Sequence, residues 1–80
     1  MKTDVSVKMM LAVNRVSKTQ YEPIDFHVFI HCEDSVSDYW GIWSHQCDEC
    51  YVVVRHGDEY CAYECKDHTH VRYMMMRIAF

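Results

Sequence analysis

Two pairs of metal-ligating side chains stand out in the second half of the chain. Cys47 and Cys50 form a C-x2-C pair, and after fourteen intervening residues Cys65 and His68 form a C-x2-H pair. Thiolate sulfur and imidazole nitrogen are the usual ligands of structural Zn2+, and this spacing is close to that of small zinc-binding modules. We predict one structural Zn2+ ion on these four residues. Three neighbours are alternative ligands: Cys61, His70 and His45.

A β-hairpin between the two pairs would bring them together. A two-residue loop at Gly57-Asp58 is a hairpin signal, because glycine tolerates the positive φ that tight turns require. This loop places Cys50 opposite Cys65 and Cys47 level with His68. Opposed Cβ atoms lie about 5 Å apart, which is near enough for two thiolates to share one ion. Buried cysteines without a ligand and a Cys50–Cys65 disulfide are the alternatives.

Residues 47–68 resemble a zinc ribbon, a module in which two metal-binding turns cap a β-hairpin. The resemblance covers about a quarter of the chain and implies a structural ion on the same four residues. Two features depart from the family pattern. Tyr51 follows the first cysteine pair where a small residue is usual, and the second pair ends in His68. These departures leave the fourth ligand open.

Alternating apolar residues predict a mainly β fold for the rest of the chain. The expected strands are residues 5–13, 24–32, 51–55, 59–63 and 71–80, with a polar loop over 14–23 and an ambiguous segment over 33–45. A helix through Met9–Val16 is an alternative, but the unbroken alternation decides for a strand. We therefore expect a single domain, residues 1–80, with a small antiparallel sheet, a zinc-ribbon-like hairpin and at most one short helix.

The strand expected over residues 24–32 divides its side chains between two faces. Ile24, Phe26, Val28, Ile30 and Cys32 alternate with polar and aromatic residues. His27 and His31 lie four residues apart and so fall on the same face, which we interpret as the solvent side. Cys32 is expected on the core face.

Charge is concentrated in the middle of the chain. Residues 21–67 carry eleven acidic side chains against Arg55 and Lys66, within a chain of net charge -4. Such a segment repels phosphate, and with exposed aromatic residues it is typical of a surface that binds a basic protein partner. The predicted partner-binding residues are Glu33, Asp34, Asp38, Tyr39, Trp40, Trp43, Asp58 and Glu59.

The function expected from these features is a small zinc-binding protein-interaction module. In size and charge the chain resembles the small acidic inhibitors of phages and mobile elements, which dock on the basic surface of a nucleic-acid-processing enzyme. The alternative is a zinc-ribbon protein that binds nucleic acid or takes part in transcription. Its basic patch would form if the terminal strands pair: Lys2, Lys8, Arg15, Lys18, Arg72 and Arg77. A purely structural subunit of a larger assembly is a third possibility.

No catalytic function is expected. His31-x-Glu33 followed by Cys47-x2-Cys50 resembles part of the zinc deaminase signature, but the proline before the first cysteine is missing and only thirteen residues separate the halves. An odd number of cysteines, with no secretory signal and no membrane-spanning segment, favours a reducing compartment, so we expect a cytoplasmic protein.

Overall fold

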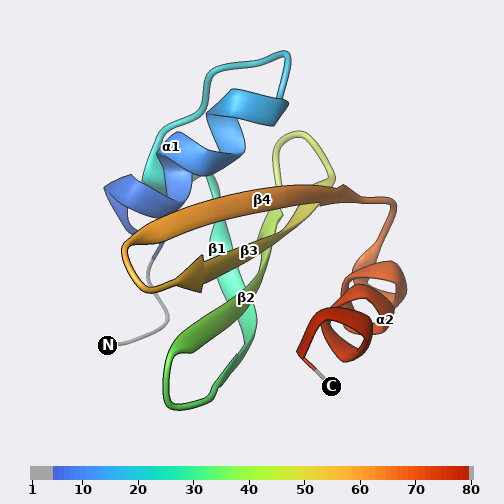
Figure 1. The fold of residues 1–80 in the computed structure, drawn as a ribbon. Coiled ribbons are helices and arrows are strands. Elements are labelled where there is room, and N and C mark those ends of the chain that lie inside the picture. Colours follow the sequence, from blue (N-terminus) through green and yellow to red (C-terminus); the bar gives the residue numbers. More distant parts are fainter. Residues whose placement is uncertain (1–4, 80) are drawn as a thin grey trace.

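The computed structural model describes residues 5–79 as a four-stranded antiparallel sheet with one helix on each face (Figure 1). The strands lie in the sheet in chain order. The mainly β, antiparallel fold is therefore confirmed, with two helices where at most one was expected. The elements are α1 (Val7–Val16), the 3-10 helix η1 (Pro23–Asp25), β1 (His27–Glu33), β2 (Ser37–Ser44), β3 (Glu49–His56), β4 (Glu59–Cys65) and α2 (His68–Ala79).

The predicted hairpin is present in the predicted register. β3 and β4 are joined by a tight turn at Gly57-Asp58, where Gly57 has a φ of 63°. Cys50 lies opposite Cys65, and Val53 lies opposite Ala62. This part of the fold follows from local turn chemistry, because a two-residue loop leaves one way to align the strands.

The strand predicted over residues 5–13 is wrong, because this segment forms α1. Ser6 is its N-cap, and the Ser6 hydroxyl oxygen accepts a hydrogen bond from the Met9 backbone N–H at 3.2 Å. Met9 and Val13, four residues apart, are buried, whereas Leu11 is 54% exposed. The buried residues therefore have helical spacing. The apolar residues that alternate with period two also include residues four apart, which form the buried face of a helix.

The strand predicted over residues 71–80 is wrong as well. Its described part belongs to α2, in which Val71 and Met75 are buried one turn apart while Met76 is 64% exposed. Phe80 lies outside the described residues. The run Met74-Met75-Met76 suits a helix, because unbranched side chains lose little rotamer freedom there. No helix within residues 5–79 has the length and apolar character needed to cross a membrane.

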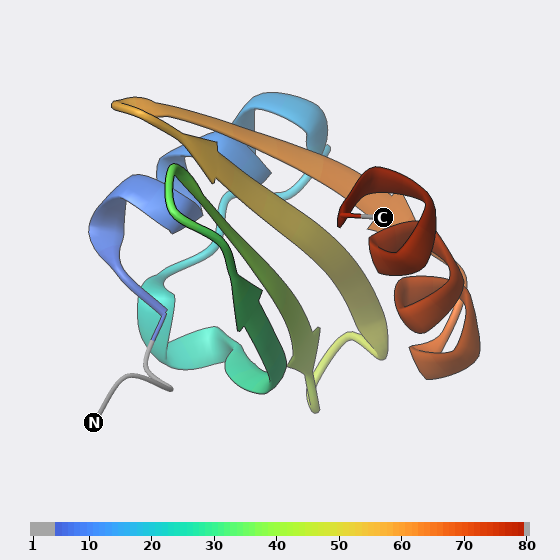
Figure 2. The same ribbon diagram turned by 60° about the horizontal axis from the view of Figure 1, so that its bottom comes forward.

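The two helices pack on opposite faces of the sheet (Figure 2). α1 lies mainly against β4 and β3, and α2 lies against β2 and β3. Gly41 of β2 permits the close approach of α2. A Cβ atom at this position would overlap Ile30 Cγ2 and come within 2.6 Å of Val71 Cγ1. Each face of the sheet has its own core, one under α1 and one under α2.

A bulge in β1 changes which residues share a face. The pairing with β2 shifts between Val28 and Ile30, so Phe29 and Ile30 both join the core under α2. After the bulge the alternation is inverted. His27 pairs with Trp43 on the α2 face, whereas His31 lies against Trp40 on the α1 face. The expectation that His27 and His31 share one face is therefore wrong, while Cys32 packs on the core as predicted.

The ambiguous segment 33–45 is mostly strand. β2 covers Ser37–Ser44, and the tight turn before it is built on Asp34 rather than on a helical turn. The strand expected from Ile24 begins later, at His27, because Pro23–Asp25 form a 3-10 turn that leaves Ile24 91% exposed.

Candidate functional site

The structure brings together one pair of the predicted zinc ligands. Cys50 and Cys65 face each other across β3 and β4, with only 2% and 6% of their surfaces exposed. Burial, followed by the neighbouring Cys50, raises the pKa of the Cys65 thiol to about 11. Both thiols lie in the core under α2. Without a bound cation they are protonated at neutral pH and act as small apolar side chains.

Cys47, the other cysteine of the C-x2-C pair, is at the surface and not in this core. It is exposed in the turn between β2 and β3, which is closed by a 3.0 Å hydrogen bond from the Asp48 backbone N–H to the Ser44 carbonyl. Its thiol is a neighbour of the Tyr21 hydroxyl: burial, then hydrogen bonding to Cys47, raises the pKa of Tyr21. Tyr21 belongs to the core under α1, and Cys50 belongs to the core under α2. Cys47 is thus exposed while Cys50 is buried, and the cysteines do not form a group of three ligand atoms within 4.8 Å of one another.

His68 begins α2, and its ring packs edge-on against Phe29 at 4.4 Å and Trp43 at 4.9 Å between ring centroids. The alternative ligands are equally dispersed. Cys61 is exposed on β4, and the Nδ1 atom of His70 accepts a hydrogen bond from the Lys66 backbone N–H at 2.9 Å. His45 is exposed after β2.

Within residues 5–79, one group brings three potential ligand atoms within 4.8 Å of one another: His31, Glu33 and Asp38. The four predicted zinc ligands do not form such a group. The chain thus offers cysteines and a His/Glu/Asp group as potential metal ligands, while Zn2+ on Cys47, Cys50, Cys65 and His68 stays a prediction.

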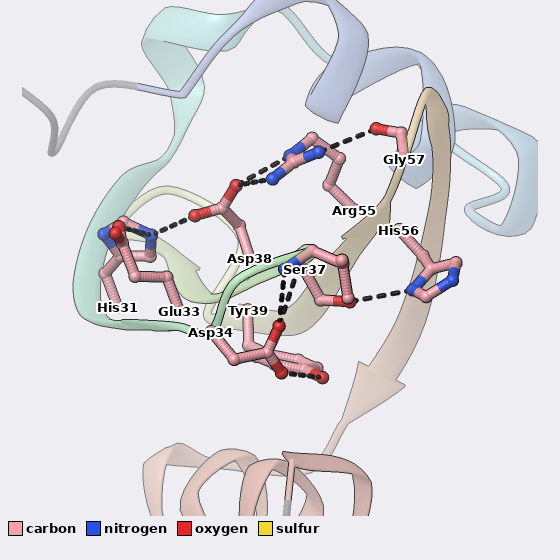
Figure 3. Close-up of polar contacts among 10 residues, drawn as sticks. His31, Glu33, Asp34, Ser37, Asp38, Tyr39, Arg55, His56 and Gly57 are labelled. Atoms are coloured by element: carbon pink, nitrogen blue, oxygen red, sulfur yellow. Dashed lines mark hydrogen bonds and ion pairs between the residues drawn. The ribbon is translucent and has the colours of Figure 1, made fainter.

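The His/Glu/Asp group is part of a surface that we call the Trp40 surface, formed by His31, Glu33, Asp34, Asp38, Trp40 and Arg55. These residues, with Ser35, line a hollow of about 560 Å³ on the α1 side of the sheet, at the end where β1 turns into β2. Figure 3 shows that β1, the following turn, β2 and β3 all contribute side chains to it.

Asp38 is the centre of the polar contacts on this surface (Figure 3). One carboxylate oxygen lies 3.1 Å from His31 Nε2, and the other accepts a hydrogen bond from Arg55 Nε at 2.6 Å. Burial alone would raise the pKa of Asp38, but the hydrogen bonds from Arg55 and His31 outweigh it and lower the pKa. Because Arg55 already neutralises this carboxylate, a metal cation has little to gain from Asp38.

Asp34 builds the turn that positions the rim of the hollow. Its Oδ1 atom accepts hydrogen bonds from the backbone N–H groups of Val36 at 3.0 Å and Ser37 at 2.9 Å. These bonds lower the pKa of Asp34. Tyr39, from the other face of β2, donates its hydroxyl to the second oxygen at 3.4 Å (Figure 3). The turn therefore presents Glu33 and Asp34 beside each other at the surface.

Aromatic rings form a row beside these carboxylates. The His31 ring stacks on Trp40 with centroids 5.2 Å apart and planes 8° apart, and Trp40 is nearly parallel to Tyr60 at 6.2 Å and 9°. The three rings come from β1, β2 and β4 and cross the sheet. Trp40 is half-buried, so its ring borders both the core and the hollow.

The predicted partner-binding residues separate into three groups. Glu33, Asp34, Asp38 and Trp40 meet on the Trp40 surface. Tyr39 is 8% exposed and packs under α2, and Trp43 also lies on that face. Asp58 and Glu59 lie in the β3–β4 turn and line a separate hollow of about 510 Å³ with Lys8 and Arg15 of α1.

A second cluster, which the sequence interpretation missed, surrounds Trp43. Its indole centroid lies 5.2 Å from the ring of His27, 4.3 Å from His45 and 4.9 Å from His68. The rings of His27 and His45 are themselves 4.6 Å apart. Burial, then the charges of His45 and His68, lowers the pKa of His27. We call these four residues, Trp43 with His27, His45 and His68, the Trp43 cluster. From the sequence, only the pairing of His27 with Trp43 across β1 and β2 could have indicated this cluster.

Comparisons with protein-family models, with curated proteins and with solved structures found no match to this chain.

Proposed function

We propose that this protein is a protein-interaction module whose Trp40 surface binds an arginine- or lysine-rich segment of a partner. The observation that carries the proposal is the meeting of three carboxylates and a stacked aromatic row around one hollow. Neither group alone is unusual on a protein surface. Together they match an arginine side chain, because its guanidinium is both positively charged and flat.

The carboxylates supply the charge complementarity. Glu33 and Asp34 are exposed at the rim, and Asp38 lies deeper. Three carboxylates face one guanidinium, that of Arg55, so the surface keeps an excess of negative charge. Exposed acidic groups steer a basic partner and set its orientation, while a carboxylate pair can accept a guanidinium bidentately.

The aromatic row supplies contact area. An arginine guanidinium stacks on the face of tryptophan or tyrosine, and such contacts contribute about 0.5–2 kcal/mol depending on how far they are desolvated. Trp40 lies between His31 and Tyr60, so a partner arginine packs against the part of the row that borders the hollow, and little side-chain freedom of Trp40 is lost when it binds.

The partner class that fits best is a protein whose basic surface normally binds nucleic acid, so that the module would act as an inhibitor. Such surfaces present several arginine and lysine residues together. The acidic rim would then occupy part of a phosphate-binding groove.

Direct binding of nucleic acid is less well supported. Its basic patch required paired terminal strands, but Lys8 and Arg15 lie on α1 and Arg72 and Arg77 lie on α2, on opposite faces of the sheet. Lys18 follows α1, and Lys2 lies outside the described residues. Nothing within residues 5–79 gathers these cations into one surface.

The test is a titration with a short oligoarginine peptide, followed by tryptophan emission. In a Trp43→Phe protein, which reports on Trp40 alone, we expect the peptide to change the emission in a saturable manner. In a Trp40→Phe protein, which reports on Trp43, we expect no saturable change.

Matched charge variants separate specific docking from general attraction. Glu33→Gln should weaken peptide binding several-fold, whereas Glu59→Gln, which removes the same charge in the β3–β4 turn, should change it little. Equal effects of the two variants would contradict the proposal. So would tight, steeply salt-dependent binding of a random DNA duplex, which would favour the nucleic-acid alternative.

A structural Zn2+ ion is a separate proposal. The buried Cys50–Cys65 pair supports it, and the turn that holds Cys47 would have to change for that thiol to reach the same side.

A further inference from the structure

We propose that the Trp43 cluster binds a divalent transition-metal ion through the imidazoles of His27 and His45, with His68 as the third ligand. This site is separate from the Trp40 surface and uses no cysteine, but it shares His68 and the alternative ligand His45 with the zinc site predicted from the sequence. It joins the start of β1, the turn after β2 and the start of α2, three segments distant in sequence.

The spacing of the first two rings fits a shared ion. An imidazole nitrogen about 2.1 Å from a metal places its ring centroid about 3.2 Å away, so two such rings at tetrahedral or octahedral angles lie about 4.5–5.2 Å apart. The His27 and His45 centroids are 4.6 Å apart. In this structure the three imidazoles do not bring three ligand atoms within 4.8 Å of one another. His68 is exposed and lies on the same indole, 4.9 Å from Trp43, so it completes the site by turning its ring away from Phe29 toward the other two.

Hydrogen bonding separates these histidines from the other three in the chain. His31 contacts Asp38, His56 contacts the Ser37 hydroxyl at 2.8 Å, and His70 accepts from the Lys66 backbone. Among the described residues, no hydrogen bond to another side chain or to the backbone occupies the ring nitrogens of His27, His45 or His68. Their nitrogen lone pairs therefore remain available to a ligand.

The surroundings favour a cation. The Asp48 carboxylate accepts a hydrogen bond from Trp43 Nε1 at 3.3 Å, which places a negative charge at the edge of the cluster. Within residues 5–79 no lysine or arginine forms an ion pair there, although the Arg72 guanidinium lies over Phe29, 6.0 Å from the centroid of the ring that His68 contacts. Imidazole selects zinc, copper, nickel and cobalt over calcium and magnesium, which prefer oxygen ligands.

The cluster contains its own reporter. Co2+ quenches the emission of an indole that it approaches, and it gives an intense near-ultraviolet band only when a thiolate is bound to it. We therefore use Co2+ as the probe and Zn2+ as the competitor, in the Trp40→Phe protein, in which Trp43 is the one emitter. We expect saturable quenching that Zn2+ reverses, without a thiolate band.

Two substitutions identify the ligands. His45→Ala, at an exposed turn position, should raise the half-quenching Co2+ concentration at least about tenfold, since even the loss of a residue that orients a metal ligand costs that much. His27→Ala should do the same. His31→Ala is the matched control, because it removes an imidazole from the other tryptophan, and it should leave the titration unchanged.

Three results would overturn the inference. The first is quenching that His45→Ala does not weaken. The second is a thiolate band together with quenching that Cys50→Ser abolishes, which would assign the ion to the cysteines. The third is stronger quenching in the Trp43→Phe protein that His31→Ala removes, which would assign it to His31, Glu33 and Asp38. None of these outcomes depends on whether the Trp40 surface binds peptide.

Discussion

Trp40 and Trp43 lie three residues apart in β2, yet they serve different regions of the molecule. Because a strand alternates its side chains, Trp40 faces α1 and Trp43 faces α2. Each indole has histidine neighbours. At Trp40 the histidine contacts a carboxylate that is already paired with Arg55, whereas at Trp43 three imidazoles surround the ring without such a partner.

The difference shows that neighbouring charges, and not the aromatic ring, decide what each region can bind. The Trp40 surface offers carboxylates and a flat stack, which suit a guanidinium on a partner protein. The Trp43 cluster offers imidazole rings that no hydrogen bond occupies among the described residues, which suit a transition-metal ion. The following predictions test this separation, beginning with the largest expected effect.

Gly41→Val should give the largest difference between the Trp43 cluster and the Trp40 surface. The added side chain would meet Ile30 and Val71, two β-branched residues that cannot move aside easily, so we expect a loss of about 3 kcal/mol in unfolding free energy. Since α2 must shift, Trp43 emission should change while Trp40 emission stays nearly constant. Urea unfolding of single-tryptophan proteins measures both. A variant as stable as the parent would show that α2 does not pack closely on β2.

Cys50→Ser and Cys47→Ser test whether the Trp43 end of the sheet also holds a structural zinc ion. From the structure, a serine at buried position 50 should cost about 2 kcal/mol, because its hydroxyl lacks a partner. The same change at exposed position 47 should cost at most about 0.5 kcal/mol. Thermal unfolding with and without EDTA measures the effect. Equal, severe losses and a chelator-dependent Tm would instead support zinc on the four predicted ligands.

Asp38→Asn should lower the free energy of unfolding, and the size of this loss should depend on pH. At neutral pH we expect a loss of about 1 kcal/mol, or about 4–8 °C in Tm, because charge-assisted bonds to Arg55 and His31 are lost. A carboxylate whose pKa is lowered on folding stabilises the protein above its unfolded pKa of about 3.9, and that stability disappears as the pH falls through the folded pKa.

The stability difference between the parent and Asp38→Asn should therefore narrow as the pH is lowered below about 4. Thermal unfolding from about pH 6 down to about pH 2 covers this range. A difference that stays constant would mean that Asp38 acts through packing and not through its charge.

His45→Ala should have the smallest effect on stability. The side chain is exposed and has no hydrogen-bond partner among the described residues, so the unfolding free energy should change by at most about 0.5 kcal/mol. Trp43 emission should nevertheless shift, because the rings are in contact at 4.3 Å, and Trp40 emission should not. A shift at both indoles would contradict the separation of the two regions.

The parts of this fold that local chemistry controls were predictable. The β3–β4 hairpin followed from a glycine turn, and its register placed Cys50 opposite Cys65. The acidic character of the middle segment was also evident, and four of its predicted residues meet on the Trp40 surface. The terminal segments were not predictable in this way, because residues 5–13 and 71–79 carry apolar patterns compatible with either period.

The sequence by itself determined the residue types available for binding and the one short-range pairing that a tight turn enforces. Tertiary structure decided which of those residues meet. A single bulge at Phe29 sends His27 to one tryptophan and His31 to the other, and the turn after β2 leaves Cys47 exposed whereas Cys50 is buried. Both depend on how β1 and the loops fit against two separately packed cores, and contacts between residues distant in the chain leave little trace in local sequence patterns.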